Sequence, residues 1–386
     1  MLNSSLEVCF VACDVGSAVH FAAQAEALRR RGCRVRAFAV SGPAIQKFQE
    51  QGLHPESFHS QGSKGIEYLI ARIGSTAAVV LTSVGNFFAA KLHGQLAIRL
   101  KQVSRWAYYD NPEPFVPGGY SSTAAMVMES VQVVLFANQN LANIPIYYKK
   151  GLEFDFSGKP RVGLGYYPID QAEKIALTRR HLVGRAKLRA QIVSPGPSPE
   201  DTTPSIWVYF GGNNTVYFSH ALPAFLRFLT EALEREVDLS RIVILLQQHP
   251  GAKKDNYDAQ QILDWVSAHG NDKGAPILLL SNLSSDQAQV AADVAFYYQT
   301  SMGPQFILAG IPTIQIGHET YSDILVKNAL IPSVCNTNAF LEIIPILIEG
   351  ALPKPEKEMV LKGLGIRENW ADFLQQTLEI FLTHQK

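Results

Sequence analysis

Residues 7–17 have the sequence Glu-Val-Cys-Phe-Val-Ala-Cys-Asp-Val-Gly-Ser, and this stretch decides the fold class. Residues 7–12 are apolar at nearly every position, which is typical of a parallel strand buried on both faces. A turn over residues 13–17 leads into a helical pattern that ends at Gly32, and a second strand is predicted over residues 35–40. A strand, a helix and a strand in this order predict a right-handed βαβ unit in a parallel sheet.

The same alternation continues through both halves of the chain. In the first half we expect further strands at residues 78–82, 106–109, 131–137 and 159–163, and in the second half at 205–210, 241–247, 277–280, 294–298 and 313–316. We therefore predict an α/β protein with two Rossmann-like, doubly wound domains facing across a cleft. The predicted parts are a first domain over residues 1–165, a basic helix and Pro/Ser-rich linker over 166–204, a second domain over 205–350 and a helical tail over 351–386.

The composition excludes several classes of function. Lys plus Arg (34) balances Asp plus Glu (34), so no general attraction to nucleic acid or to an anionic membrane is expected, and any anionic ligand must be held by a local arrangement. The four cysteines form no Cys-x-x-Cys pair, which argues against structural zinc and favours a reducing, cytoplasmic setting. A signal peptide is not apparent, and no apolar run is long enough for a transmembrane helix.

Ligands of open α/β sheets bind outside the carboxyl ends of the strands, so the residues that follow strands are the candidates for a site. Asp14, Gly16 and Ser17 follow the first strand and begin a helix, which suits an anion or a sugar hydroxyl. Asp110 and Glu113 follow the strand at 106–109, and either carboxylate is a candidate general base for a sugar hydroxyl. A plain turn, with solvated acids in the second case, remains the alternative for both segments.

The second half offers three further strand ends. Gly211, Gly212 and Asn213 let the main chain approach a ligand and supply polar groups, although a simple turn would have the same composition. His249 precedes Pro250 and is a candidate donor to a phosphate or nucleotide oxygen.

The third of these strand ends has the sequence Gln-Thr-Ser-Met-Gly-Pro-Gln over residues 299–305. Thr300, Ser301 and Gly303 lie at a predicted helix start, where hydroxyl and main-chain N–H groups can hold an anion without a basic residue. This arrangement would explain how a chain of zero net charge binds an anion.

Residues 300–305, followed by Leu-Ala-Gly-Ile-Pro over 308–312, resemble GT-B nucleotide-sugar enzymes. The resemblance includes lipid-A-disaccharide synthase, the peptidoglycan GlcNAc-transferase and UDP-GlcNAc 2-epimerase. It implies that the turn binds the diphosphate and that Gln305 contacts the ribose in place of the family's glutamate. It further implies that the loop with His318 and Glu319 touches the donor sugar or the acceptor.

Two other segments bear on the resemblance. His249-Pro250 is similar to the His-Pro motif of GT-B sialyltransferases, which use CMP-sugars. Residues 82–87 match the segment that carries catalytic aspartates in lipid-A-disaccharide synthase but contain no acid, so Asp110 or Glu113 would have to act as the base.

The sequence thus leads us to expect a metal-independent glycosyltransferase without a cofactor, which moves a sugar from a nucleotide-sugar to a hydroxyl acceptor. Two alternatives stay open, a nucleotide-sugar epimerase or hydrolase of the same fold and a non-catalytic nucleotide-sugar-binding protein. The basic segment 172–191 could contact an anionic membrane as a peripheral surface, or be an ordinary solvated helix.

Overall fold

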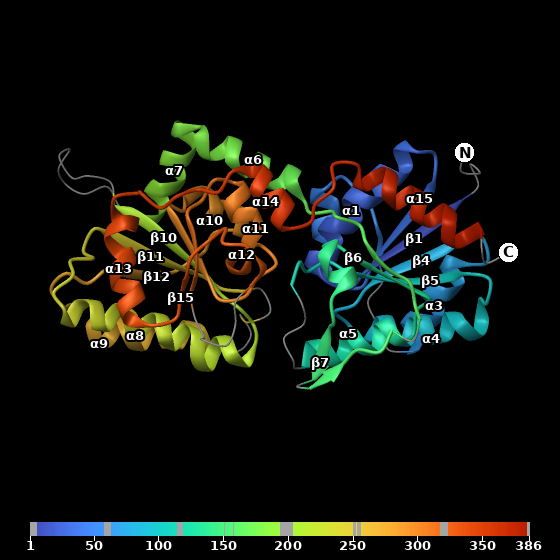
Figure 1. Ribbon diagram of the computed structural model, residues 1–386, viewed down its shortest axis with the longest axis horizontal. Coiled ribbons are helices and arrows are strands. Elements are labelled where there is room, and N and C mark those ends of the chain that lie inside the picture. The colour runs from blue at the N-terminus through green and yellow to red at the C-terminus, as the bar shows by residue number, and fades with distance from the viewer. Residues whose placement is uncertain are drawn as a thin grey trace. The chain divides into compact units, whose positions relative to one another are not determined.

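The computed structural model describes residues 6–57, 63–113, 119–149, 151–156, 158–193, 204–249, 252, 256–316 and 323–383. The chain forms two compact units (Figure 1). Unit 1 comprises Met1–Pro168 and Leu364–Lys386, and unit 2 comprises Ile169–Gly363. None of the helices in the described residues is long and apolar enough to cross a membrane.

Unit 1 is built on a seven-stranded parallel sheet with the strand order β3-β2-β1-β4-β5-β6-β9. The strands are β1 (Glu7–Ala12), β2 (Arg34–Ala39), β3 (Glu56–Ser57), β4 (Val79–Ser83), β5 (Ser104–Tyr109), β6 (Val133–Phe136) and β9 (Arg161–Gly163). The helices are α1 (Val15–Arg30), α2 (Gly42–Glu50), α3 (Ser63–Ile73), α4 (Phe87–Arg99), α5 (Gly119–Glu129) and α15 (Trp370–Thr383). A short 3-10 helix, η1 (Asn140–Asn143), and an antiparallel hairpin of β7 (Tyr147–Lys149) and β8 (Leu152–Glu153) follow β6.

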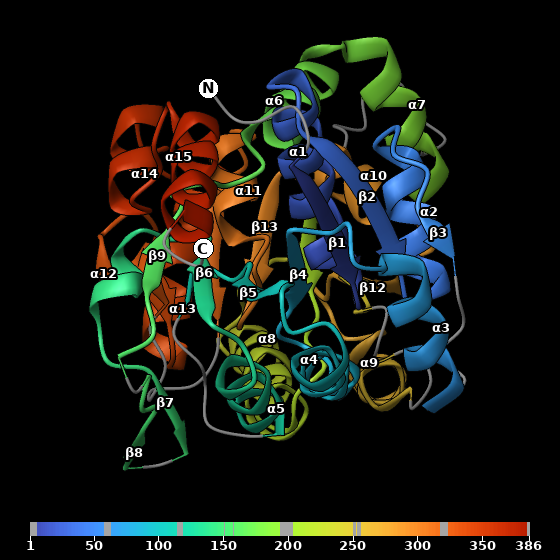
Figure 2. The same cartoon turned by 90° about the vertical axis from the view of Figure 1, so that its right-hand side faces the viewer.

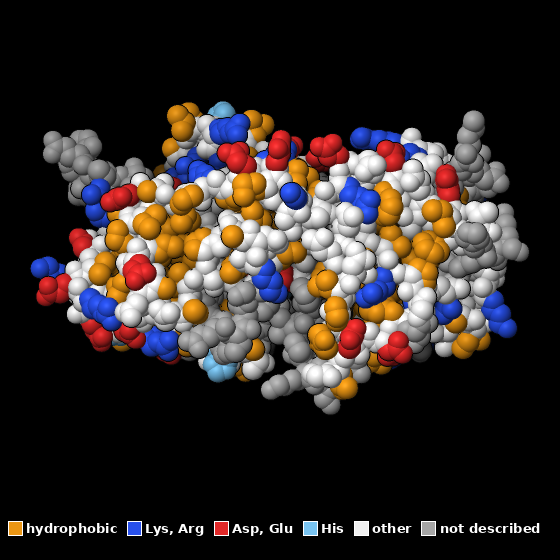
Figure 3. Space-filling model, viewed as in Figure 1, with side chains coloured by type: hydrophobic (Ala, Val, Ile, Leu, Met, Phe, Trp, Pro, Cys, Tyr) orange, Lys and Arg blue, Asp and Glu red, His pale blue; other side chains and the backbone are white. Residues whose placement is uncertain are grey.

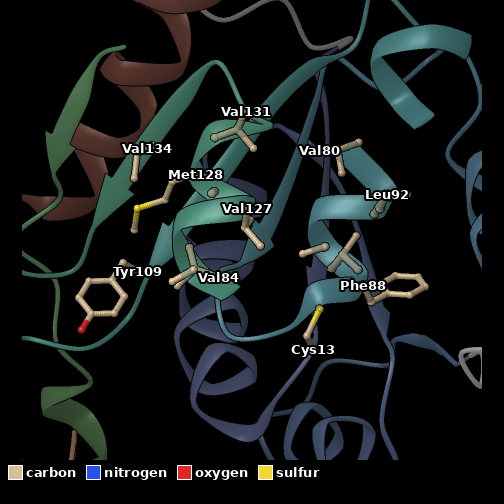
Figure 4. Close-up of a cluster of buried hydrophobic side chains, with 14 of the residues drawn as sticks. Cys13, Val80, Val84, Phe88, Leu92, Tyr109, Val127, Met128, Val131 and Val134 are labelled. Atoms are coloured by element: carbon tan, nitrogen blue, oxygen red, sulfur yellow. The ribbon is translucent and has the colours of Figure 1, made fainter. Parts of the chain in front are cut away.

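Helices cover both faces of this sheet, which explains the continuous apolar sequence of β1. Alternate residues of β1 enter two different cores, with Phe10 packed among residues of α1, α2 and α15 and Val11 among residues of α3, α4 and α5. Figure 2 shows these two groups of helices on opposite sides of the strands. Figure 4 shows Phe88 of α4 and Met128 of α5 within the second core.

Unit 2 repeats this plan with a six-stranded parallel sheet in the order β12-β11-β10-β13-β14-β15. The strands are β10 (Ser205–Phe210), β11 (Ile242–Gln247), β12 (Ile277–Leu280), β13 (Val294–Tyr297), β14 (Thr313–Ile316) and β15 (Ser333–Val334). The helices are α6 (Ile169–Arg180), α7 (Leu182–Ile192), α8 (Leu222–Glu234), α9 (Tyr257–His269), α10 (Ser285–Ala291), α11 (Gly303–Leu308), α12 (Ile324–Lys327), α13 (Thr337–Ile348) and α14 (Lys357–Gly363). A π-helical turn, η2 (Tyr217–Ala221), leads into α8.

Both sheets have a point at which the strand order reverses. In unit 1 the chain passes from β1 outward to β2 and β3 and then returns to β4 on the other side of β1. In unit 2 it passes from β10 to β11 and β12 and returns to β13 on the other side of β10. Ligands of open α/β sheets bind outside the carboxyl ends of the strands at such points. The prediction of two Rossmann-like, doubly wound domains is confirmed.

The last helix of the chain belongs to unit 1. Leu374 and Leu378 of α15 lie in the core on the α1 face of the sheet, and the ring of Trp370 packs against Tyr166 at 4.3 Å between centroids. Asp372 forms an ion pair with Arg31 at the end of α1. Unit 1 is therefore assembled from segments at both ends of the sequence.

The basic segment 172–191 folds as α6 and α7 in unit 2. Three of its arginines, Arg179, Arg185 and Arg189, donate to main-chain carbonyls of residues 289–292 at the end of α10. Arg185 and Arg189 also pair with Asp293, at 2.6 and 2.7 Å. Cations are stabilised by the free carbonyls at a helix carboxyl end, so part of the positive charge of this segment holds unit 2 together. The linker residues 194–203 lie outside the described residues.

Candidate functional site

At the reversal point of unit 1, Asp14 and Ser17 form the start of α1. The Asp14 carboxylate accepts a hydrogen bond from the main-chain N–H of Ser17 at 2.8 Å, and the Ser17 hydroxyl donates to the Asp14 carbonyl at 3.1 Å. This is an N-cap, which satisfies one of the unpaired N–H groups of the first helical turn. Asp14 and Ser17 therefore have a structural role, whatever else they contact.

Gly16 leaves room for the carboxylate of Asp110. A Cβ atom on Gly16 would lie 2.5 Å from Oδ2 of Asp110 and 3.6 Å from Oδ1 of Asp14. A side chain at this position would therefore displace the Asp110 carboxylate. The two carboxylates predicted for different roles, Asp110 as base and Asp14 as a ligand-binding group, lie together at the first turn of α1.

The electrostatics of this pair suit proton transfer near neutral pH. Burial, and then the negative charge of Asp14, raise the pKa of Asp110 to about 7, although a main-chain hydrogen bond opposes the shift. A carboxyl group with a pKa near the working pH can both accept and return a proton. Asp110 as a whole residue is only partly buried.

Glu113 lies in the turn that follows Asp110. Its side chain is buried, its N–H donates to Oδ1 of Asn111 at 3.0 Å, and its carbonyl accepts from the Tyr109 hydroxyl at 2.5 Å. These contacts fix the turn at the end of β5. Of the two candidate bases, Asp110 is the acid that the structure places beside Asp14 and Gly16.

A pair of residues that the sequence did not single out supports this edge of the sheet. Nδ1 of His20, on α1, lies 2.6 Å from the hydroxyl of Tyr108, which lies on β5 two residues before Asp110. Burial lowers the pKa of His20 to about 3, so the imidazole is neutral and α1 is tied to β5 without an ionic contact. A lone histidine inside a helical pattern gives no sequence signal for such a contact.

In unit 2 the two glycines after β10 are packed against Tyr217. A Cβ atom would lie 2.7 Å from the Tyr217 hydroxyl at Gly211 and 3.0 Å from the tyrosine ring at Gly212. The glycines therefore let the chain run close to this ring at the reversal point. Asn213, which follows them, is exposed.

One hydrogen bond joins the two turns that flank the reversal point of unit 2. Nδ2 of Asn214 donates to Oε1 of Gln299 at 3.0 Å, while Oδ1 of Asn214 accepts from the Tyr217 N–H at 2.8 Å. The segments 211–214 and 299–303, both predicted to bind the donor, are thus neighbours in the fold. Their 85-residue separation in sequence hides this contact.

His249 follows β11, next to the turn at 211–214, because β10 and β11 pair in parallel up to Phe210 and Gln247. Burial lowers the pKa of His249, and the charge of Asp258 acts in the opposite direction. The neighbouring Gln248 donates to the buried Asp258 at 2.8 Å. A neutral imidazole at this position can still donate one hydrogen bond to a ligand.

The turn at residues 299–303 is held by its own polar groups. The Thr300 hydroxyl accepts from the Met302 N–H at 3.2 Å, and a Cβ atom on Gly303 would lie 3.0 Å from the hydroxyl of Tyr297. Ser301 is partly buried and Gln305, in the short helix α11, is buried. Thr300 and Gly303 therefore shape the turn that holds Ser301 between β13 and α11.

Two other predicted donor-binding residues, His318 and Glu319, lie outside the described residues. Within the described residues there is no group of three or more His, Cys, Asp or Glu side chains that could hold a metal ion.

Neither the protein-family models nor the curated protein sequences include a significant match to this sequence. Solved structures do match over nearly the whole chain. UDP-GlcNAc 2-epimerase from Neisseria meningitidis, solved with UDP-GlcNAc bound, has 12% sequence identity and a TM-score of 0.61, over 97% of this chain and 100% of its own. HepE from Anabaena, solved with UDP and glucose, has 11% identity and a TM-score of 0.63, over 97% and 99%.

A glycosyltransferase from Rickettsia africae has 11% identity and a TM-score of 0.60, over 97% of both chains. At this identity the likeness shows the fold, which is the GT-B fold, as the sequence predicted. The similarity of His249-Pro250 to the sialyltransferase motif stays a prediction, because Pro250 lies outside the described residues.

Proposed function

We propose that this chain is a glycosyltransferase that moves a sugar from a nucleotide-sugar to a hydroxyl acceptor, with the nucleotide bound by unit 2. The observation that carries the proposal is the Asp110 carboxyl group beside Asp14 and Gly16, with a pKa of about 7. A hydroxyl acceptor needs a base that is ionised yet basic at neutral pH, and these surroundings support Asp110 in that role.

The nucleotide site that we propose lies at the reversal point of unit 2. It is supported by the hydrogen bond between Asn214 and Gln299, which brings the two candidate turns together. Gly211, Gly212 and Asn213 line one turn, and Thr300, Ser301 and Gly303 the other, while the resemblance assigns the ribose to Gln305 and the donor sugar or acceptor to His318 and Glu319. The matching structures solved with UDP-GlcNAc, and with UDP and glucose, make UDP-sugars the first donors to test.

In the proposed reaction, ionised Asp110 takes the proton of the acceptor hydroxyl. The acceptor oxygen forms a bond to the anomeric carbon, and the bond from that carbon to the diphosphate oxygen breaks, leaving the electron pair on the diphosphate. Main-chain N–H groups, Ser301 and neutral His249 would stabilise this charge by hydrogen bonds. No metal and no cofactor takes part, so turnover is expected to persist in EDTA.

The test begins with a thermal-shift panel of UDP, CMP, CDP, GDP and dTDP and their sugars, because a ligand that binds only the folded state raises its apparent stability. The nucleotide-sugar that binds is then incubated with and without sugar acceptors, and the products are separated by chromatography. Release of nucleotide with a glycosylated product only when acceptor is present supports transfer. Binding without any product would instead support a non-catalytic nucleotide-sugar-binding protein.

A second candidate, an epimerase or hydrolase, is favoured by the same carboxyl pair, since Asp14 and Asp110 could exchange a proton at a sugar carbon. Incubation with UDP-GlcNAc in D₂O, without an acceptor, distinguishes an epimerase from a hydrolase. An isomer carrying deuterium would identify epimerisation, whereas free sugar and nucleotide would identify hydrolysis.

We propose that the protein works in the cytoplasm. All four cysteines are free, which suits a reducing compartment.

A further inference from the structure

The helices α6 and α7 have two faces of different character. On α6, Ala172 and Ile175 are buried and Arg179 continues this inner face at the next turn. Arg185 and Arg189, four residues apart on α7, bind Asp293 from the same side. The inner face therefore fixes both helices on unit 2.

The outer face combines basic and apolar side chains with an exposed acid, Glu173, whose charge is paired with Lys357. Lys174, Arg180 and Lys187 are exposed. Between them lie Leu177, Leu182 and Val183, with exposed fractions of 69%, 79% and 62%. Side chains three or four residues apart share a helix face, so Lys174, Leu177 and Arg180 form one row and Val183 and Lys187 another. We call these six residues the α6–α7 corner.

The corner is held in a fixed shape. His181 joins the two helices, and its Nδ1 accepts a hydrogen bond from the Gly184 N–H at 3.3 Å, which caps α7. No residue of α7 is buried, so its apolar side chains do not serve the core of unit 2. Figure 3 shows hydrophobic side chains next to Lys and Arg side chains over α6 and α7. A solvated helix normally presents polar residues at such positions.

We propose that the α6–α7 corner docks the protein on an anionic phospholipid surface. Exposed leucine and valine side chains suit insertion at the level of the headgroups, and flanking cations suit the negative charge of the lipid. The arginines that bind α10 and Asp293 are excluded from this role because they already hold unit 2 together. The lipid-facing charge comes instead from Lys174, Arg180 and Lys187.

The test is co-sedimentation of the full-length protein with vesicles of phosphatidylcholine alone and of phosphatidylcholine mixed with phosphatidylglycerol. We expect binding to the anionic vesicles only, and weaker binding as salt is added, because salt screens exposed charges. Replacing Arg180 and Lys187 by Gln should weaken binding by about fivefold for each cation. Replacing Leu182 and Val183 by Ser should weaken it by about tenfold or more.

Leu263→Ser is the matched control, since Leu263 is also an exposed leucine, with an exposed fraction of 54%, but lies on α9. It should bind the anionic vesicles as the unchanged protein does. All the substituted side chains are exposed, so thermal unfolding should be nearly unchanged in every variant. The proposal is overturned if the unchanged protein stays in solution with anionic vesicles. It is also overturned if Leu263→Ser lowers binding as much as the change at Leu182 and Val183.

Discussion

Asp110→Asn should make the protein more stable above pH 7 while strongly lowering its turnover. The folded protein holds the Asp110 proton up to a pH of about 7, whereas an ordinary aspartate releases it near 3.8. As the pH rises through this window, the unfolded chain has already lost the proton and the folded state loses stability relative to it. The full loss of folding stability is present above pH 7, and it vanishes below pH 3.8.

The size of the effect follows from the pKa shift. A shift from 3.8 to about 7 corresponds to roughly 4 kcal/mol. Two effects reduce this value, since Asp110 is only partly buried and the amide of asparagine needs hydrogen-bond partners of its own. We therefore expect Asp110→Asn to raise the free energy of unfolding by about 1–3 kcal/mol. Turnover should fall by about 10²- to 10⁴-fold, because the amide cannot take the acceptor proton.

Urea denaturation at a series of pH values measures the stability, and nucleotide release with the best donor measures the turnover. Asp14→Asn is the informative companion, because asparagine caps a helix as well as aspartate but removes the neighbouring charge. In that variant the pKa of Asp110 falls, so the rise of turnover with pH should move to lower pH. Asp264→Asn, an exposed acid on α9, should change neither quantity.

The assignment of Asp110 as a base with a raised pKa is wrong if Asp110→Asn is no more stable than the unchanged protein above pH 7. It is equally wrong if turnover of the unchanged protein does not vary with pH around 7, since the pKa of the proposed base lies there.

Two further predictions concern unit 2. Gly211→Ala places a methyl group 2.7 Å from a tyrosine hydroxyl, so nucleotide affinity measured by calorimetry should fall about tenfold, an effect of about 1.4 kcal/mol. Gly94→Ala is the control, because a Cβ atom on Gly94 would meet no atom of another segment within 4 Å, and it should leave the affinity unchanged. Equal losses in both variants would contradict the assignment of Gly211 to the nucleotide site. Asp293→Ala removes the partner of two arginines and should lower the free energy of unfolding by about 1–3 kcal/mol in urea denaturation. Asp264→Ala should cost under about 0.5 kcal/mol, and a similar loss in Asp293→Ala would show that the arginine contacts contribute little.

Much of the fold could be predicted because its signals are local. The continuous apolar run of β1 reflects helices on both faces of the sheet, and Gly32 ends α1 with a φ of 84°, a conformation that favours glycine. The candidate residues at strand ends could be named for the same reason, since parallel strands bring their carboxyl ends to one edge.

Other features could not be predicted because they depend on contacts between distant segments. Arg179 and Arg180 are adjacent and chemically identical, yet Arg179 binds the carbonyls of α10 and Arg180 is exposed. The packing of α15 on unit 1, with Leu374 in its core, is equally invisible in a pattern that any amphipathic helix would show.

The sequence by itself determined the two parallel sheets and pointed to the strand ends as candidate ligand sites, because the period of apolar residues and the positions of glycine are local properties of the chain. Only the tertiary structure decided which acid has the surroundings of a base. Asp110 acquires its raised pKa from burial and from the charge of Asp14, which lies at a different strand end. A pKa depends on desolvation and on nearby charges in space, and neither can be read from the order of residues along the chain.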